Sequence, residues 1–164
     1  MTAGDRPAVD RLARVVFALL VVACFAAFFI TQRLKHTPTV VQLFKLTPSF
    51  SPTLPGFTKQ EAISFKLSRA DEVTVTIERA RGGEVATLVR DRAVTRYKQF
   101  SLRWNGRSGV ARGYTVLKGR NGHTILLVAT DGALAPGGEY RIRVSLREQH
   151  RSVLSPRNFR LVGP

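Results

Sequence analysis

The chain has 164 residues, with 26 Lys and Arg against 11 Asp and Glu, which gives a formal net charge of +15. Its one cysteine, Cys24, excludes a disulfide within the chain, so a folded domain has to be stable through burial of its core. The charge favours anionic partners such as lipid headgroups, envelope polymers, nucleic acid or an acidic protein. An Arg-rich composition, here 20 Arg to 6 Lys, also produces such a charge without selection for any ligand.

An uncharged stretch of 18 residues occupies positions 15–32, and its first part, 15–30, is wholly apolar. A transmembrane helix needs roughly 17–25 such residues. We therefore predict one transmembrane helix at 15–32, after a short basic tail at 1–14.

Two other interpretations of this stretch stay open. A cleaved signal peptide normally has a shorter apolar core that ends at small residues, whereas this run ends in the bulky Phe28, Phe29 and Ile30. A lipoprotein would use the segment 21–24 and its Cys24, but the residues after this cysteine remain apolar where a mature lipoprotein turns polar.

Basic residues flank the helix evenly, so they do not decide its orientation. They are Arg6, Arg11 and Arg14 before it, and Arg33, Lys35 and Lys45 after it. A short N-terminal tail and a large C-terminal domain are the usual shape of a signal anchor. This shape predicts that the domain lies outside the cytoplasm.

Prolines mark the segment that follows, at Pro38, Pro48, Pro52 and Pro55. Proline in this density is incompatible with a helix. We predict an extended tether at 33–47, with a candidate first strand at 40–46.

Beyond the tether, apolar and polar residues alternate with a period of two, which is typical of half-buried strands. Turn signals, such as Gly82-Gly83 and Asn121-Gly122, separate the runs. Several short strands at this spacing predict a β-sandwich or barrel, and no amphipathic helix is predicted after residue 36. The expected strands lie at 63–67, 73–77, 85–89, 100–104, 114–117, 123–128 and 140–146.

The order of short motifs between residues 48 and 162 resembles the FlgD-type immunoglobulin-like domain. This domain is named for the flagellar hook-capping protein and occurs on many unrelated bacterial surface and secreted proteins. The motifs are Phe50-Ser51-Pro52, the segments 63–67, 70–77 and 83–88, Trp104-Asn105-Gly106, Asp131-Gly132, Pro136-Gly137-Gly138-Glu139-Tyr140 and the segment 141–144. The resemblance implies an all-β immunoglobulin-like sandwich at 48–164 in a bacterial cell envelope. It does not imply flagellar work, because a fold does not fix a function.

Two departures from the family pattern are informative. The family has Trp-Asp-Gly where this chain has Trp104, Asn105 and Gly106, which with Tyr140 make up the structural family motif, and in the family this Trp looks like a packing residue. The residues at about 107–130 form an insertion that we interpret as an extra hairpin. Its tip, with Lys118, Arg120 and Asn121, is a candidate contact surface.

No pattern of catalytic, cofactor-binding or metal-binding residues is present in the sequence. The histidines, His36, His123 and His150, are far apart, and there is no cysteine pair for zinc. No serine lies in a nucleophile elbow, and the glycine pairs lack the lysine of a phosphate-binding loop. We therefore predict a protein that is not an enzyme and has no cofactor.

Basic residues alternate along the strand at 140–146 and continue after it, at Arg141, Arg143 and Arg147. With Lys118, Arg120 and Asn121 they complete the candidate interaction surface. A nucleic-acid-binding sheet would also expose aromatic rings between its basic residues. Here the aromatic residues, apart from Tyr97, are predicted on the buried face, which argues against nucleic acid.

The sequence thus predicts a non-catalytic binding or scaffold module, anchored in the bacterial cytoplasmic membrane by one helix. Its partners would be anionic envelope polymers, lipid headgroups or other membrane proteins. One alternative is an accessory subunit of a membrane complex, for which Ala23, Ala26 and Ala27 offer a small-residue helix face. The other is a basic domain that faces the cytoplasm and binds nucleic acid or anionic lipid.

Overall fold

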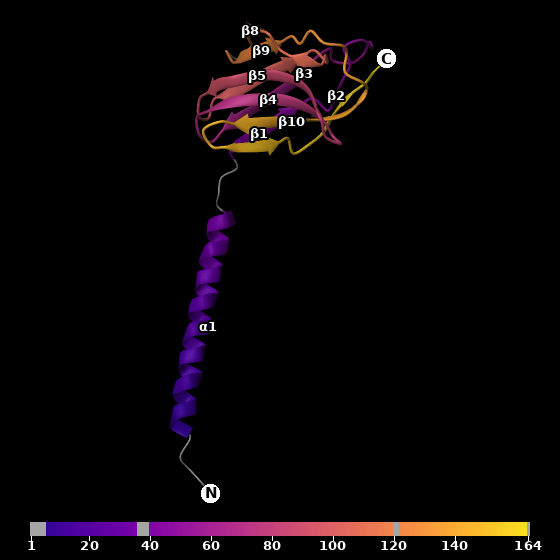
Figure 1. The fold of residues 1–164 in the computed structure, drawn as a ribbon. Coiled ribbons are helices and arrows are strands. Elements are labelled where there is room, and N and C mark those ends of the chain that lie inside the picture. The colour runs from indigo at the N-terminus through magenta and orange to yellow at the C-terminus, as the bar shows by residue number, and fades with distance from the viewer. Residues whose placement is uncertain (1–5, 36–39, 120–121, 164) are drawn as a thin grey trace. The chain divides into compact units, whose positions relative to one another are not determined.

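The structure is a computed structural model that describes residues 6–35, 40–119 and 122–163 (Figure 1). The chain divides into two compact units, Met1–Pro38 and Thr39–Pro164. Among the described residues, the first contains a single helix and the second contains the strands.

Helix α1 runs from Arg6 to Lys35. Within it, Ala13–Thr31 is a stretch of 19 residues with a mean hydropathy of 2.6 and no buried side chains, so it is long and apolar enough to cross a membrane. The helix begins well before the apolar run and includes much of the predicted basic tail. Hydropathy predicts the apolar stretch but not the helix ends. Arg, Leu and Ala all favour helix, so these residues before position 15 can extend the helix beyond the apolar stretch.

The first sheet of the C-terminal unit has five strands. Its pairs are antiparallel except for the parallel pair β6 and β9. In spatial order the strands are β1 (Val41–Leu46), β3 (Glu61–Leu67), β6 (Gln99–Trp104), β9 (Thr124–Val128) and β8 (Tyr114–Lys118).

The second sheet is also mixed, with parallel pairs at both of its edges. A further short strand, β11 (Arg151–Leu154), pairs with β10 beside β12. In spatial order the other strands are β2 (Ser49–Phe50), β12 (Phe159–Leu161), β10 (Gly138–Leu146), β4 (Asp71–Arg79), β5 (Glu84–Val94) and β7 (Gly109–Val110).

Every strand that the alternating pattern predicts is present within a few residues of its expected bounds, including the first strand after the tether. No helix follows α1 in the described part of the domain. The structure adds the short strands β2, β7, β11 and β12, which contain only two to four residues each and are too brief to show a period in the sequence.

The two sheets share one hydrophobic core. Trp104 of the first sheet is fully buried, and its ring centroid lies 5.7 Å from that of Phe50 and 6.0 Å from that of Tyr140, both in the second sheet. Aromatic contacts at these distances stabilise a core beyond simple area burial. Trp104 therefore connects the layers, as the sequence predicted for a packing residue.

The segment 107–130 does more than add a hairpin to the surface. After β6 the chain crosses to the second sheet as β7 and then returns to the first sheet as β8 and β9. Leu126 and Val128 of β9 are buried in the core, and β9 pairs with β6. This half of the expected insertion is therefore part of the domain core, and only β8 and the turn project from it.

Candidate interaction site

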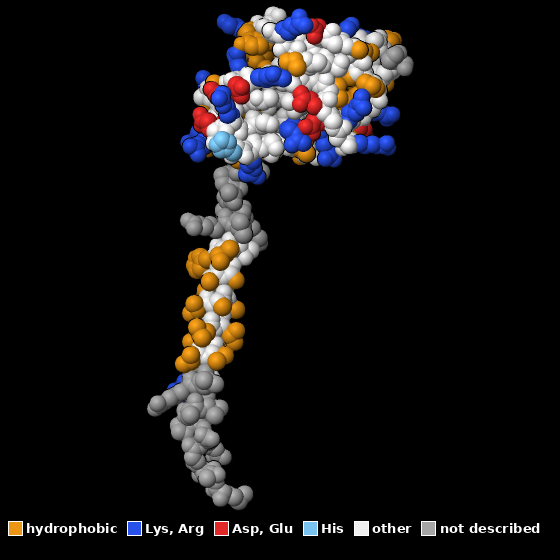
Figure 2. All heavy atoms as spheres, viewed as in Figure 1, with side chains coloured by type: hydrophobic (Ala, Val, Ile, Leu, Met, Phe, Trp, Pro, Cys, Tyr) orange, Lys and Arg blue, Asp and Glu red, His pale blue; other side chains and the backbone are white. Residues whose placement is uncertain are grey.

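The edge strand β8 is exposed along its whole length. Tyr114, Val116 and Leu117 have 42%, 53% and 41% of their surface exposed, although each is large and apolar or aromatic. In the part of the chain that the structure describes, β8 pairs only with β9. Hydrophobic side chains gather at the top of the domain in Figure 2, where Figure 1 places β8 and β9. The strand thus has an open edge with apolar side chains on it.

Hydrogen bonding in the hairpin shows which backbone groups of β8 face outward. The N–H of Gly119 donates to the carbonyl of His123 at 2.8 Å, and the register continues without a shift to Tyr114 opposite Val128. In an antiparallel pair, hydrogen-bonded and non-hydrogen-bonded positions alternate. Thr115 and Leu117 therefore bond to β9, while the N–H and C=O groups of residues 114, 116 and 118 point to the free edge.

The second sheet does not cover the inner face of β8. Tyr114 and Val116 lie opposite Val128 and Leu126 of β9, which are buried in the core. The side chains of Tyr114 and Val116 are therefore on the inner face of the first sheet. The second sheet ends at this side with β7, which pairs with β5 only at Ala86 and Thr87. The sandwich is therefore incomplete between β8 and β5.

A cleft of about 370 Å³ lies at this opening, lined by residues 87–92 of β5 and 110–114. We call β8, residues 88–92 and Val110 the open flank. Val110 is itself 43% exposed, and Leu88 forms a buried floor. The open flank therefore combines exposed apolar side chains, backbone N–H and C=O groups that point to the free edge of β8, and the adjacent cleft.

Basic side chains surround the open flank. The guanidinium of Arg92 lies 4.6 Å from the centroid of the Tyr114 ring, a cation–π geometry. Arg112 forms an exposed ion pair with Asp131 at 3.3 Å, which stabilises little. Among the described residues, no carboxylate lies within 4.0 Å of the charged groups of Arg90, Arg92 or Lys118. Their charge is thus available to an anionic partner.

The predicted basic residues on β10 have partners within the domain. The guanidinium of Arg143 donates to both carboxylate oxygens of Glu78, at 2.5 and 3.0 Å, and this contact raises the pKa of the arginine. Arg147 lies 2.9 Å from the carboxylate of Glu72, and Arg141 donates to the side chain of Asn158 at 2.6 Å. These arginines are engaged within the domain, and Arg143 joins β10 to β4, so they are less available to bind a ligand.

The four predicted interaction residues that the structure describes do not form one surface. Lys118 ends β8 at the edge of the first sheet, whereas Arg141 and Arg143 lie on the outer face of the second sheet. Arg120 and Asn121 lie outside the described residues. Basic side chains are accordingly spread over the visible face in Figure 2, with acidic side chains among them.

The exposure of Tyr114 corrects the expectation that only Tyr97 among the aromatic residues avoids the buried face. Both tyrosine rings have an arginine over one face. The guanidinium of Arg92 lies over Tyr114, and that of Arg96 lies 4.4 Å from the ring centroid of Tyr97. The sequence pattern missed Tyr114, Val116 and Leu117 as site residues. A strand pattern shows which residues share a face, but not whether a second layer covers that face.

The predicted family motif residues have structural roles. The indole N–H of Trp104 donates to the carbonyl of Arg107 at 2.8 Å, and the side chain of Asn105 bonds to Thr130 through both its oxygen and its nitrogen. Gly106 has a positive φ of 80°, and a Cβ there would lie 2.6 Å from the ring of Pro52. Together they hold the turn after β6.

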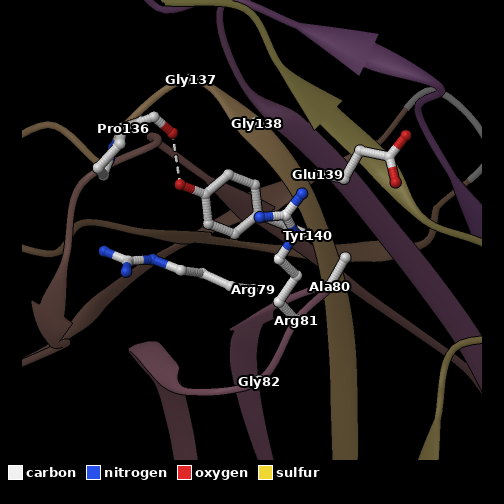
Figure 3. Close-up of a pocket in the computed structure, with 9 residues that line it drawn as sticks. All are labelled: Arg79, Ala80, Arg81, Gly82, Pro136, Gly137, Gly138, Glu139 and Tyr140. Atoms are coloured by element: carbon white, nitrogen blue, oxygen red, sulfur yellow. Dashed lines mark hydrogen bonds between the residues drawn. The ribbon is translucent and has the colours of Figure 1, made fainter.

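A second cleft, of about 650 Å³, lies between residues 79–82 and 136–140 (Figure 3). The Tyr140 hydroxyl donates to the carbonyl of Pro136, and burial raises the pKa of Tyr140 although neighbouring Arg79 opposes the shift. Arg79 and Arg81 lie beside the tyrosine ring, while Glu139 points away from it. Both arginines are exposed at a hairpin end, and the hydroxyl of the buried Tyr140, which lines the cleft, is already bonded to Pro136.

Two acidic residues, Asp71 and Glu61, are buried without an ion pair among the described residues, and only Asp71 accepts hydrogen bonds through both carboxylate oxygens. Glu61 begins β3 and is fully buried; its Oε1 accepts from the N–H of Thr47 at 2.8 Å, and its Oε2 has no partner among the described residues. Burial raises its pKa to about 8, against the smaller opposing effect of the Thr47 bond. The carboxyl is therefore neutral at pH 7, because desolvation penalises its charged form.

No group of three or more His, Cys, Asp or Glu within the described residues could hold a metal ion. Comparison of the chain with models of protein families, with curated proteins and with solved structures finds no match. Function is therefore inferred from the residues and their geometry.

Proposed function

We propose that this chain is a non-catalytic interaction module, anchored in a bacterial cytoplasmic membrane by α1, with its β domain outside the cytoplasm. The domain binds protein partners of the cell envelope at the open flank. The observation that carries this proposal is the edge strand β8, whose apolar side chains and outward backbone groups have no partner among the described residues. Exposed apolar patches and open strand edges are typical of docking surfaces.

The anchor is supported by the stretch Ala13–Thr31 of α1. Apolar side chains along this stretch are exposed in the chain alone and need a nonpolar environment. Lipid provides one, and the helix then serves to hold the domain at the membrane surface. Anionic lipid headgroups or envelope polymers would add a nonspecific attraction to a domain with this positive charge.

An immunoglobulin-like sandwich of the FlgD type is the fold that we propose for the domain. Two details support it besides the order of the sequence motifs. Trp104 is buried between the sheets. Tyr140 lies near the start of β10 and donates its hydroxyl to the backbone four residues upstream, which is the arrangement of the tyrosine corner of immunoglobulin-like sandwiches.

The proposed function can be tested by photo-crosslinking in cells. A photoreactive side chain in place of Val116 should form a discrete crosslinked product with an envelope protein. The matched control replaces Ala62, which is exposed on the outer face of the same sheet, and should give no such product. Identical crosslinking from both positions, or none from position 116, would contradict the proposal.

A second candidate function is that of an accessory subunit within a membrane complex. The specific observation that favours it is the small-residue face of α1 at Ala23, Ala26 and Ala27, since small residues let helices approach closely in lipid. In this case the complex should co-migrate with the chain on gel filtration in detergent. Replacing these alanines by leucine should then release the chain.

A third candidate is a domain that faces the cytoplasm and binds nucleic acid or anionic lipid. The exposed rings of Tyr97 and Tyr114, each with an arginine over one face, favour it. It requires the opposite membrane orientation, so a topology measurement separates it from the first proposal.

A further inference from the structure

We propose that the open flank accepts an extended, acidic segment of a partner protein as an added strand on β8. The inference rests on the proposed binding function and specifies the chemistry of the partner. It predicts a bound segment whose apolar side chains alternate with carboxylates.

The backbone of β8 is suited to strand addition. The N–H and C=O groups of Tyr114, Val116 and Lys118 point outward, and the register with β9 has no bulge. Proteins commonly protect edge strands with proline, with bulges or with several charged residues. In β8 a single Lys118, at the end of the strand, is the only such feature.

The side-chain pattern of the added strand follows from the geometry of the sheet. Every second residue of an adjacent strand would point to the same face as Tyr114 and Val116, toward the cleft of about 370 Å³ beside β5. Exposed Val110 and buried Leu88 line that cleft. Apolar side chains at alternate positions of the segment would therefore extend the core across the incomplete side of the sandwich.

Charge selects the kind of partner. Arg90, Arg92 and Lys118 have no carboxylate within 4.0 Å among the described residues, while Asp91 and Asp131 at this site already contact Arg147 and Arg112. Because the added strand lies at the sheet edge, carboxylates at its two ends can reach the long side chains of Arg92, beside Tyr114, and of Lys118, at the end of β8. A second copy of the chain is disfavoured, because each copy has a net charge of +15 and would bring the same basic residues to the interface.

The test uses the full chain in nanodiscs of neutral lipid and the synthetic peptide acetyl-Glu-Val-Glu-Val-Glu-Val-Glu-amide. Two control peptides replace the central Val by Pro or every Glu by Lys. Binding is measured by titration, and hydrogen exchange is followed at single amides. Peptide binding should slow exchange on the order of tenfold or more at residues 114, 116 and 118. Thr115 and Leu117 already bond to β9 and should change little.

Two protein variants sharpen the test. Val116→Asn removes the apolar contact in the open flank without adding a charge and should weaken peptide binding on the order of tenfold, whereas Ala62→Asn on the outer face should bind as the parent chain does. Val116→Pro removes one outward N–H without removing a bond to β9, so it should also prevent binding while the domain stays folded.

Three results would overturn strand addition. In the first, the proline peptide binds as tightly as the acidic peptide. In the second, the acidic peptide binds but hydrogen exchange at the amides of residues 114, 116 and 118 does not change. In the third, the acidic peptide does not bind. Slower exchange that depends on protein concentration alone would identify a second copy as the occupant and also contradict the inference. If the peptide fails but position 116 still crosslinks to a partner in cells, the proposed function stands and only strand addition is wrong.

Discussion

The two edges of the first sheet differ in a way that bears on function. At one edge, β1 shifts register against β3 between Gln42 and Lys45, and Leu43 has a positive φ of 51°. At the other edge, β8 keeps an unbroken register and exposes apolar side chains. A bulge interrupts the row of hydrogen-bonding groups that another strand would need. One edge of this sheet is thus closed to pairing, while the other is left open.

The largest expected effect comes from the core that both edges share. Trp104→Ala should lower the free energy of unfolding by about 3–5 kcal/mol, because it leaves a cavity between the sheets. Denaturant unfolding of the full chain in detergent, followed by circular dichroism, measures this loss. Tyr97→Ala is the matched control, since Tyr97 is exposed and should change stability little. A similar loss for both variants would contradict a core packed around Trp104.

A pH-dependent effect is expected at the end of β1, where Glu61 bonds to Thr47. With its pKa raised to about 8, the folded chain keeps a proton that the unfolded chain loses near 4.5. The free energy of unfolding should therefore fall as pH rises from about 4.5 to about 8. By this linkage the domain at pH 7 is less stable than at pH 4 by on the order of 3 kcal/mol.

Glu61→Gln should remove this dependence, because the amide does not titrate. Thermal unfolding of the parent chain and of the variant, measured from pH 5 to pH 9, tests the expectation. The two curves should diverge with rising pH, the variant being the less sensitive. Parallel curves would show that Glu61 does not titrate with a raised pKa.

A smaller effect is expected on the basic face of β10. Arg143→Ala removes a half-exposed ion pair with Glu78 and should cost about 1 kcal/mol of stability. It should leave crosslinking from position 116 unchanged, since Arg143 lies on the other sheet. Crosslinking that depends on Arg143 as strongly as on β8 would mean that the basic face, and not the open edge, is the site.

The smallest effect concerns the closed edge. Leu43→Gly should raise the free energy of unfolding by about 0.5 kcal/mol, because glycine adopts the positive φ of this position without a Cβ conflict. Thermal unfolding in detergent measures the change, with Leu117→Gly in the regular strand β8 as a control that should destabilise. If Leu43→Gly and Leu117→Gly destabilise the domain equally, the positive φ of Leu43 does not strain β1.

The sequence predicted the apolar stretch of α1 and most strands because hydropathy and period are local properties. Ile63, Phe65 and Leu67 alternate with polar residues, and the structure buries all three. The exposure of Val116 follows from where the second sheet ends, and the pairing of Arg143 with Glu78 joins residues 65 positions apart. Both depend on the topology of the sheets, which alternation within one strand does not contain.

Glu61 illustrates the same limit at a single residue. In the sequence it is an ordinary acid at the start of a strand, and its position two residues before Ile63 places it on the inward face. Only the neighbouring β1 and Trp104 opposite it on β6 show that this face is closed to water there. The candidate site and the buried acid were therefore both outside the reach of pattern analysis.

The central claim is that the domain presents the open edge of β8 outside the cytoplasm. The most direct test is thiol labelling in intact bacterial cells that overproduce the chain, with Cys24→Ser and Val116→Cys in place. A membrane-impermeant maleimide should label position 116 in intact cells, while Val128→Cys, buried on the neighbouring strand, should stay unlabelled. Labelling of position 116 only after cell lysis would contradict the account and place the domain in the cytoplasm.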